Sequence, residues 1–283
     1  MPFIPRGSRQ TGFRGGVAAM LAAACLAAAT PEPITPREPI ALFNGTDLSG
    51  FTTWLPKFGR DDPDRVFTVV DHVDGAPAIR ISGQHWGGLI TRQAYADYRL
   101  VVEFRWGFAT WAQRKNKARD SGVLLHCQGE EGNRSPDFSS PWMHSIEAQI
   151  IEGGTGDILA LAGHLRKGGE LIRPRLTATV TPGTSVWNPA GNPIQYQRRI
   201  DWQYRDPEWK DVLGFRGRRD VEKPVGEWNR YEIICAGGDV IYFLNGVKVN
   251  EGRDGSLRKG RIFFQSEGAE IYFRRIELHP LKP

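Results

Sequence analysis

The segment from Ser145 to Glu152 carries two carboxyl groups and an amide at spacings that suit chemistry on a sugar. Apolar and polar residues alternate along it, which predicts a β-strand with Glu147 and Gln149 on its polar face. A one-residue bulge would bring Glu152 to the same face. Glycosidic bond cleavage uses two carboxyls, one for the leaving oxygen and one for carbon or water. The alternative interpretation is a solvated sheet face without a catalytic role.

Two histidines stand at the ends of strands that border this segment. His126 lies near the end of the apolar strand 123–127, and His144 directly precedes Ser145. A histidine is a natural acid or base because its pKa lies near neutrality. Both are therefore candidate catalytic residues, with a surface or packing role as the alternative.

Tryptophans are candidate sugar platforms, because an indole face packs on the apolar face of a pyranose ring. Trp111 and Trp142 stand close in sequence to the polar segments, whereas Trp106 alternates with core residues of its strand. Trp142, two residues before His144, is the strongest candidate.

The elements that position these residues are short β-strands. Residues 100–106 alternate cleanly, and Asn245-Gly246 predicts a tight hairpin between two further strands. Helical periodicity is almost absent, which favours an all-β, two-sheet antiparallel jelly roll in a single domain over residues 40–283. The stretch 181–225 has little strand pattern but is rich in aromatics, so we expect it to pack over one rim of the site.

The N-terminus has the pattern of an export signal. A region with Arg6, Arg9 and Arg14 precedes an apolar run, which predicts a signal peptide over residues 1–29. Lipidation at Cys25 is the alternative, and we favour ordinary cleavage. The proline-containing residues 30–39 are predicted to be a linker. The mature chain has no further apolar segment of transmembrane length, which indicates a periplasmic or secreted protein.

Composition and charge limit the classes of ligand and partner that we expect for this protein. The formal net charge of the 283 residues is +5, and no basic run with interleaved aromatics indicates a nucleic-acid surface. Cys127 and Cys235 would form a disulfide or remain buried thiols, and no Cys/His spacing indicates a zinc site. Oligomeric state is left open.

Six short motifs together resemble the 3-keto-disaccharide hydrolase domain family. They follow the family order from residue 41 to residue 274: Ala41 to Phe51, Asp120 to Val123, Ser145 to Asp157, Gly226 to Asn229, Asn245-Gly246, and Phe264 to Arg274. The resemblance implies a concanavalin A-like jelly roll, the lectin and glucanase architecture, with a concave face that holds carbohydrate. It also implies action on sugars whose C3 hydroxyl has been oxidised to a ketone.

Two of the motifs supply further candidates. Gln265 and Glu267 belong to the family landmarks, and strand alternation places both on one face, where we expect substrate contacts. The series Glu147-x-Gln149-x-x-Glu152 also resembles the acid strand of β-glucanases, Glu-x-Asp-x-x-Glu, but has an amide at its centre. That departure argues against ordinary retaining glucanase chemistry.

A ketone at C3 favours elimination over direct hydrolysis. It acidifies the C2 proton, so that a base can remove it, the aglycone can leave C1, and water can add back. We predict Glu147 and His144 as acid and base, with Glu152 and His126 as further candidates and Gln149 orienting the substrate. The enolate that forms must also be stabilised, either by hydrogen-bond donors or by a divalent cation held by a histidine and a glutamate. No ligand spacing in the sequence indicates such a cation.

The predicted function is therefore an exported enzyme that cleaves glycosidic bonds of 3-keto-glycosides. The alternatives are a non-catalytic carbohydrate-binding jelly roll and a conventional β-glucanase.

Overall fold

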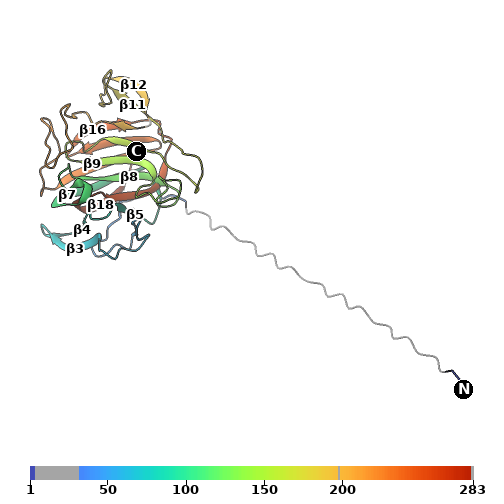
Figure 1. The fold of residues 1–283 in the computed structure, drawn as a ribbon. Helices are drawn as coiled ribbons and strands as arrows, with labels where there is room; N and C mark the ends of the chain where they lie inside the picture. The colour runs from blue at the N-terminus through green and yellow to red at the C-terminus, as the bar shows by residue number, and fades with distance from the viewer. Residues whose placement is uncertain (4–31, 197, 282–283) are drawn as a thin grey trace. The chain divides into compact units, whose positions relative to one another are not determined.

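Two antiparallel sheets of eight strands each form the body of the protein in the computed structural model, which describes residues 1–3, 32–196 and 198–281 (Figure 1). The first sheet has the order β16-β15-β14-β7-β18-β4-β3, with β1 paired to β18. Its strands are β1 (Ile40–Ala41), β3 (Phe67–Val73), β4 (Ala76–Ile81), β7 (Tyr98–Thr110), β14 (Asn229–Ala236), β15 (Asp239–Leu244), β16 (Val247–Gly252) and β18 (Ala269–Pro280).

The second sheet has the order β13-β10-β9-β8-β17-β5-β2, with β6 paired to β17. Its strands are β2 (Phe51–Trp54), β5 (Gly87–Thr91), β6 (Tyr95–Ala96), β8 (Asp120–Gln128), β9 (His144–Ile151), β10 (Ile158–Leu161), β13 (Arg199–Ile200) and β17 (Lys259–Ser266). Every ladder within the two sheets is antiparallel, as expected for an all-β jelly roll.

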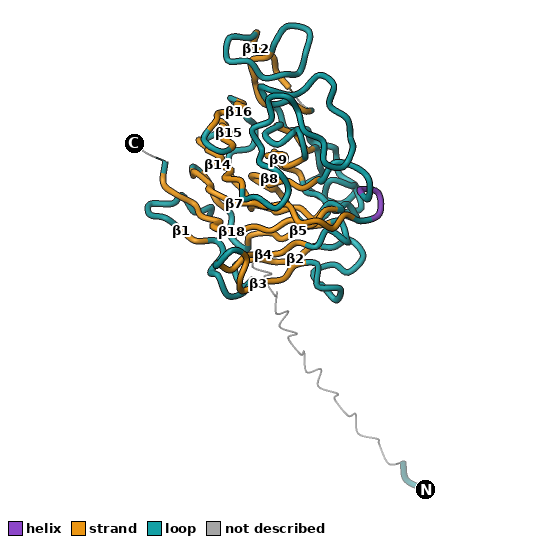
Figure 2. Tube along the Cα trace, turned by 90° about the vertical axis from the view of Figure 1, so that its left-hand side faces the viewer, coloured by secondary structure: helices purple, strands orange, loops and turns teal. Residues whose placement is uncertain are grey.

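The remaining elements are small. A hairpin of β11 (Leu176–Val180) and β12 (Asn192–Tyr196) projects from one end of the sheets (Figure 2), and a single 3₁₀ turn, η1, spans Ala112–Arg114. No helix in the described part of the chain has the length and hydrophobicity needed to cross a membrane.

The core lies between the two sheets because each strand presents alternate residues to the other sheet. In β14, for example, buried and partly exposed residues alternate along the whole strand. In β9, the apolar residues Ile146, Ala148 and Ile150 belong to this core. The polar residues Glu147 and Gln149 therefore lie on the opposite side of the second sheet, which we call the outer face.

The outer face of the second sheet has an apolar half. A separate cluster of buried side chains contains Leu124 of β8, Phe263 of β17 and Trp142, with Trp86 packed against it. The Trp86 and Trp142 rings are stacked with centroids 6.0 Å apart. These aromatics cover one half of the outer face, and the polar residues of β8, β9 and β17 occupy the other half.

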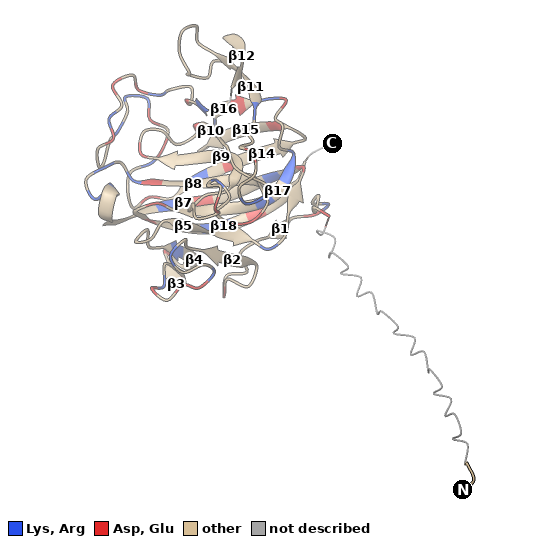
Figure 3. Cartoon of the chain, turned by 45° about the vertical axis from the view of Figure 1, so that its right-hand side comes forward, with Lys and Arg blue, Asp and Glu red and all other residues tan. Residues whose placement is uncertain are grey.

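Charged residues are interspersed over the strands and loops (Figure 3). On the first sheet, Arg99 and Arg230 both pair with Glu232 at 2.9 Å, and Arg274 pairs with Glu103 at 2.8 Å. Partly exposed pairs of this kind contribute little to stability individually.

The predicted N-terminal segments are only partly described. Residues 4–29 of the predicted signal peptide 1–29, with the alternative lipidation site Cys25, lie outside the described residues. Within the predicted linker 30–39, Ile34 exchanges two backbone hydrogen bonds with the chain around Tyr95, at 2.9 and 3.1 Å. The domain therefore makes contacts with the chain from Ile34, ahead of the predicted start at residue 40.

Both cysteines of the domain are buried free thiols. Cys127 and Cys235 are unpaired, and burial raises the pKa of each thiol to about 12. A protonated, buried thiol is unreactive and packs as a small apolar group. Of the two possibilities left open by the sequence, the structure has the buried thiols.

Candidate functional site

Three carboxyl groups gather on the polar half of the outer face. Asp120 begins β8, Glu147 lies in β9, and Glu267 follows β17. The negative charge of Asp120 raises the pKa of both glutamates, and that of Glu147 raises the pKa of Glu267. The strands are adjacent in the order β9-β8-β17, and Gly122 of β8 is the direct partner of Gln149 in β9. We call Asp120, Glu147 and Glu267 the acid cluster.

Asp120 is the member with the most hydrogen-bond donors. Burial raises the pKa of Asp120 to about 7, although the Arg114 guanidinium beside it acts in the opposite direction. Arg114 forms an ion pair with Oδ2, and the Gln149 amide donates to Oδ1 at 3.0 Å. These donors favour the carboxylate over the neutral acid. Sequence reasoning did not include Asp120 or Arg114 among the site residues.

Glu147 has no ion pair among the described residues and is buried with 3% of its surface exposed. Burial, and then the negative charge of Asp120, raise the pKa of Glu147 to about 8. Burial thus holds the pKa of both Glu147 and Asp120 well above the ordinary range of a carboxyl, so that each can gain or lose a proton near neutral pH. Two neighbouring carboxyls that can carry a proton near neutral pH are suited to acid and base catalysis.

A glycine makes room for the acid cluster. A Cβ atom added to Gly122 would lie 2.6 Å from Oε1 of Glu147 and 2.7 Å from Oε1 of Gln265. The two side chains therefore meet over this glycine, one from each neighbouring strand. Any side chain at position 122 would compete with them for space.

The amides of the site retain unused acceptors. The Oε1 atoms of Gln149 and Gln265 are buried, and neither has a hydrogen-bond partner among the described residues. An unpaired buried carbonyl is costly, so these oxygens are suited to accept hydrogen bonds from sugar hydroxyls. Burial also raises the pKa of Glu267 well above its ordinary value, with Asp120 and Glu147 adding to the effect.

The structure thus brings together four of the predicted site residues: Glu147, Gln149, Gln265 and Glu267. It does not place Glu152 with them. The register of β9 is regular as far as Ile151, so the predicted bulge is absent there. Glu152 binds Arg119 at 2.7 Å and the backbone amide of Gly214 at 2.9 Å.

The two histidines also lie elsewhere. The chain bulges in β8 instead of β9, at His126, whose φ of 54° turns its ring toward the core against Tyr98. Burial lowers the pKa of His126 to about 4. His144 shares the strand parity of the core residue Ile146, and its Nδ1 lies 3.0 Å from the backbone oxygen of Leu161. Neither ring contacts the acid cluster.

The predicted tryptophans have different positions. Trp142 is buried in the apolar half of the outer face, stacked on the half-buried Trp86. Trp111 is 39% exposed, and its backbone amide donates to the oxygen of Gly268, directly after Glu267. Trp111 thus stands at the rim beside the acid cluster, whereas Trp142 and Trp86 form an aromatic wall.

The stretch 181–225, which has little strand pattern in its sequence, packs on the second sheet and forms part of its edge. It supplies β13, whose Arg199 pairs in register with Leu159 of β10. Trp202 is buried in the core, and the indole of Trp209 donates to the backbone oxygen of Glu152 at 2.8 Å. The aromatics of this stretch are thus its anchors.

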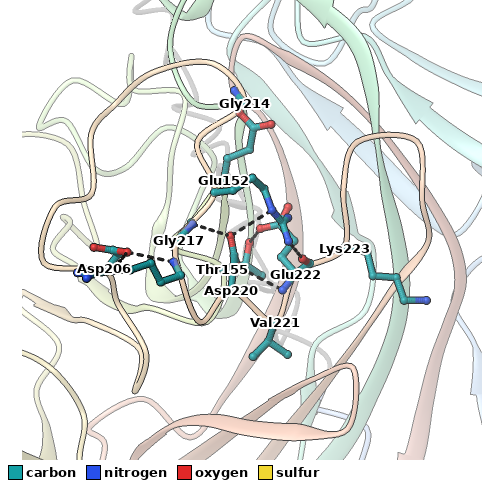
Figure 4. Close-up of polar contacts among 12 residues, drawn as sticks. Glu152, Thr155, Asp206, Gly214, Gly217, Asp220, Val221, Glu222 and Lys223 are labelled. Carbon is teal, nitrogen blue, oxygen red and sulfur yellow. Dashed lines mark hydrogen bonds and ion pairs between the residues drawn. The ribbon is translucent and has the colours of Figure 1, made fainter.

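A second group of acidic side chains, Glu152, Asp220 and Glu222, lies where the stretch 181–225 contacts the sheets (Figure 4). Glu222 accepts one hydrogen bond from the Trp106 indole at 2.5 Å and one from the Thr155 hydroxyl at 2.7 Å. Burial, then the neighbouring Asp220, raise the pKa of Glu222 to about 8. A cavity of about 250 Å³ adjoins it, with Glu152 also in its wall.

We expect the free energy of unfolding to fall less between pH 5 and pH 8 in the Glu222→Gln variant than in the wild-type protein. The raised pKa means that the folded chain holds this proton more tightly than the unfolded chain, so its stabilising effect is full below pH about 4.5. That effect is lost as the pH rises toward about 8, by about 1.4 kcal/mol per pH unit. Glutamine retains the hydrogen bonds and cannot ionise.

Urea unfolding at both pH values measures the difference, with the exposed Glu227→Gln as control. Equal pH slopes in wild type and Glu222→Gln would contradict this.

Within residues 1–3, 32–196 and 198–281, no three His, Cys, Asp or Glu side chains are arranged to hold a metal ion. The acid cluster instead has arginines around it. Arg114 contacts Asp120 directly, and the positive charges of Arg199 and Arg134 offset part of the rise in the pKa of Glu147 that burial and Asp120 cause.

The sequence profile of the 3-keto-alpha-glucoside-1,2-lyase-like domain matches residues 38–279. The chain belongs to this family. It is accordingly a carbohydrate-active, glycosidase-like domain, and the matched range contains the whole acid cluster. A comparison with curated protein sequences gave no match.

Solved structures similar to this lyase-like domain are distant. A proposed glycosyl hydrolase from Parabacteroides distasonis ATCC 8503 is 18% identical, with a TM-score of 0.47 over 87% of this chain and 94% of that one. The carbohydrate-binding module CBM66 from Bacillus subtilis is 10% identical, with a TM-score of 0.41 over 81% and 94% of the two chains. The fold assignment rests on the two sheets themselves.

Proposed function

We propose that this domain cleaves the glycosidic bond of 3-keto-glycosides by elimination followed by hydration. One observation carries the proposal: buried carboxyls on one sheet face, with pKa values of about 7 and about 8, in a chain of the 3-keto-alpha-glucoside-1,2-lyase-like family. Both pKa values lie near neutral pH, where general acids and bases work best.

Asp120 is the base in this proposal. Its carboxylate removes the proton from C2, and the electron pair of that C–H bond moves into an enolate that includes the C3 oxygen. Burial raises its pKa, and the ion pair with Arg114 keeps part of the population ionised at neutral pH.

Glu147 is the acid. The enolate collapses to a C1–C2 double bond, the C1–O bond breaks, and Glu147 gives its proton to the departing oxygen. Water then adds its hydroxyl to C1 while its other proton passes to Glu147, and Asp120, whose proton has exchanged with solvent, gives a proton to C2. The net reaction is hydrolysis of the glycosidic bond.

Wild-type protein incubated with 3-keto-trehalose should release glucose, whereas trehalose itself should remain intact, because only the ketone acidifies the C2 proton. Running the reaction in D₂O should place deuterium at C2 of the keto sugar, as read by NMR. A parallel reaction with chelator tests the divalent cation alternative. Cleavage of trehalose at an equal rate would overturn the elimination mechanism and favour a conventional glycosidase.

A non-catalytic carbohydrate-binding domain is the second candidate. The unpaired acceptors of Gln149 and Gln265 would serve binding alone. Binding of 3-keto-trehalose without release of glucose or deuterium exchange would favour this function.

We also propose that the protein is exported. The arginine-rich start followed by an apolar run supports a signal peptide. Its removal is measured by the mass of the N-terminus of protein recovered from the periplasm or medium.

A further inference from the structure

Arg199 lies in line with the proposed acid across the sheet. In the register of the second sheet, Glu147 of β9 pairs with Leu159 of β10, and Leu159 pairs with Arg199 of β13. Directly paired residues project from the same side of a sheet, so Arg199 shares the outer face with Glu147. Two strand spacings separate their backbones by about 10 Å, which an extended arginine spans in large part.

The guanidinium of Arg199 has an unused donor. Its Nε is buried and makes no hydrogen bond with the described residues, although Oδ2 of Asp157 lies 3.5 Å away. Asp157 is already bound by Arg205 at 2.8 Å and by the backbone amide of Trp202 at 2.7 Å. Arg199 is therefore not needed to neutralise Asp157 alone.

The other arginines near the acid cluster are placed differently. Arg114 is engaged by Asp120 and by Asp211 at 2.8 Å. Arg134 is exposed in the loop before β9. Arg199 is the half-buried cation on the same face as Glu147, with Leu159 between them.

We infer that Arg199 binds the C3 oxygen of the substrate and stabilises the enolate that forms when the C2 proton leaves. This inference rests on the proposed function, and it adds a residue that stabilises the enolate to the base Asp120 and the acid Glu147. An enolate oxygen carries nearly a full negative charge, whereas the ketone carries a partial one. A fixed guanidinium thus stabilises the transition state more than the ground state.

The assignment also explains selectivity for the oxidised sugar. A guanidinium has only donors, which suit a carbonyl oxygen that has only lone pairs. The Oε1 atoms of Gln149 and Gln265 have only lone pairs to offer and suit the hydroxyls that remain on the ring. Donor and acceptor positions in the site are thus divided between the ketone and the hydroxyls.

The test compares Arg199→Ala and Arg199→Gln with Arg198→Ala, an exposed arginine one position away. Removing a donor to a developing oxyanion costs about 10² to 10³ in kcat. We expect losses of that size for both Arg199 variants on 3-keto-trehalose, with slower deuterium exchange at C2 and little change in KM. Added guanidinium should restore part of the activity of Arg199→Ala. Arg198→Ala should stay within a few-fold of wild type.

A purely structural role gives a different result. If Arg199 only balances the charge of Asp157, the double variant Arg199→Ala, Asp157→Asn should regain wild-type kcat, and guanidinium should have no effect. That outcome, or wild-type kcat in Arg199→Ala itself, would overturn the inference. If the wild-type protein neither exchanges nor cleaves 3-keto-trehalose, the proposed function falls and this inference with it. Unfolding midpoints of all variants separate folding defects from loss of catalysis.

Discussion

Glu147→Gln is expected to lower kcat on a 3-keto-glycoside by about 10² to 10⁴ while the domain remains folded. Glutamine has the shape of the protonated carboxyl that burial favours at neutral pH, so the packing between β8 and β17 is retained. It has no proton to give to the leaving oxygen. Steady-state kinetics with 3-keto-trehalose measures the loss.

The pH profile gives this prediction a second readout. The pKa of Glu147 is about 8, so wild-type kcat should fall as the pH rises above that value and the acid loses its proton. The Glu147→Gln variant should lack this limb. The matched control is Glu152→Gln, which changes a buried carboxyl directly after β9 that contacts Arg119 and Gly214 instead. Activity of Glu147→Gln within a few-fold of wild type would show that the acid is another group.

Gly122→Ala is the second change with a large expected effect. The added methyl group would lie within 2.7 Å of the Oε1 atoms of both Glu147 and Gln265. The ends of these two side chains must therefore move. A displacement of about 1 Å in a catalytic site costs on the order of 10² in rate. We expect kcat/KM to fall by that amount, with the unfolding midpoint close to that of the wild-type domain, because only the flexible ends of two side chains are displaced.

Gly88→Ala provides the contrast for that experiment. Its added methyl group would lie 1.9 Å from the ring of Phe263, which is fully buried in the apolar half of the same face. Overpacking of a buried aromatic should cost about 1 to 3 kcal/mol of stability. If Gly122→Ala unfolds as readily as Gly88→Ala, or keeps full activity, the glycine is not shaping the site.

The fold was predictable from the sequence because its signals are local. Period-two alternation in the stretch that becomes β7, and the Asn245-Gly246 turn, depend only on neighbouring residues. The family resemblance supplied the pairing of distant strands, which alternation alone does not contain. The chain's family membership over residues 38–279 and the two antiparallel sheets confirm both expectations.

The site was predictable only where alternation holds. Glu147 and Gln149 share a face as predicted, since β9 is regular. The predicted bulge was wrong, because the irregularity lies one strand away at His126, and a bulge leaves little trace in composition. Asp120 and Arg199 were missed because they reach the site through strand pairing, with partners far away in sequence.

The two-residue strand β13 is expected to have lower local stability than the central strands of the second sheet. The acids Asp120 and Glu147 belong to β8 and β9, which have a hydrogen-bonded neighbour on either side, whereas Arg199 lies on the edge strand β13, whose ladder with β10 comprises residues 199–200. Edge segments open locally at lower free energy than central strands, by fraying that leaves the rest of the sheet intact. The proposed acid and base would then persist through brief openings in which the cation withdraws.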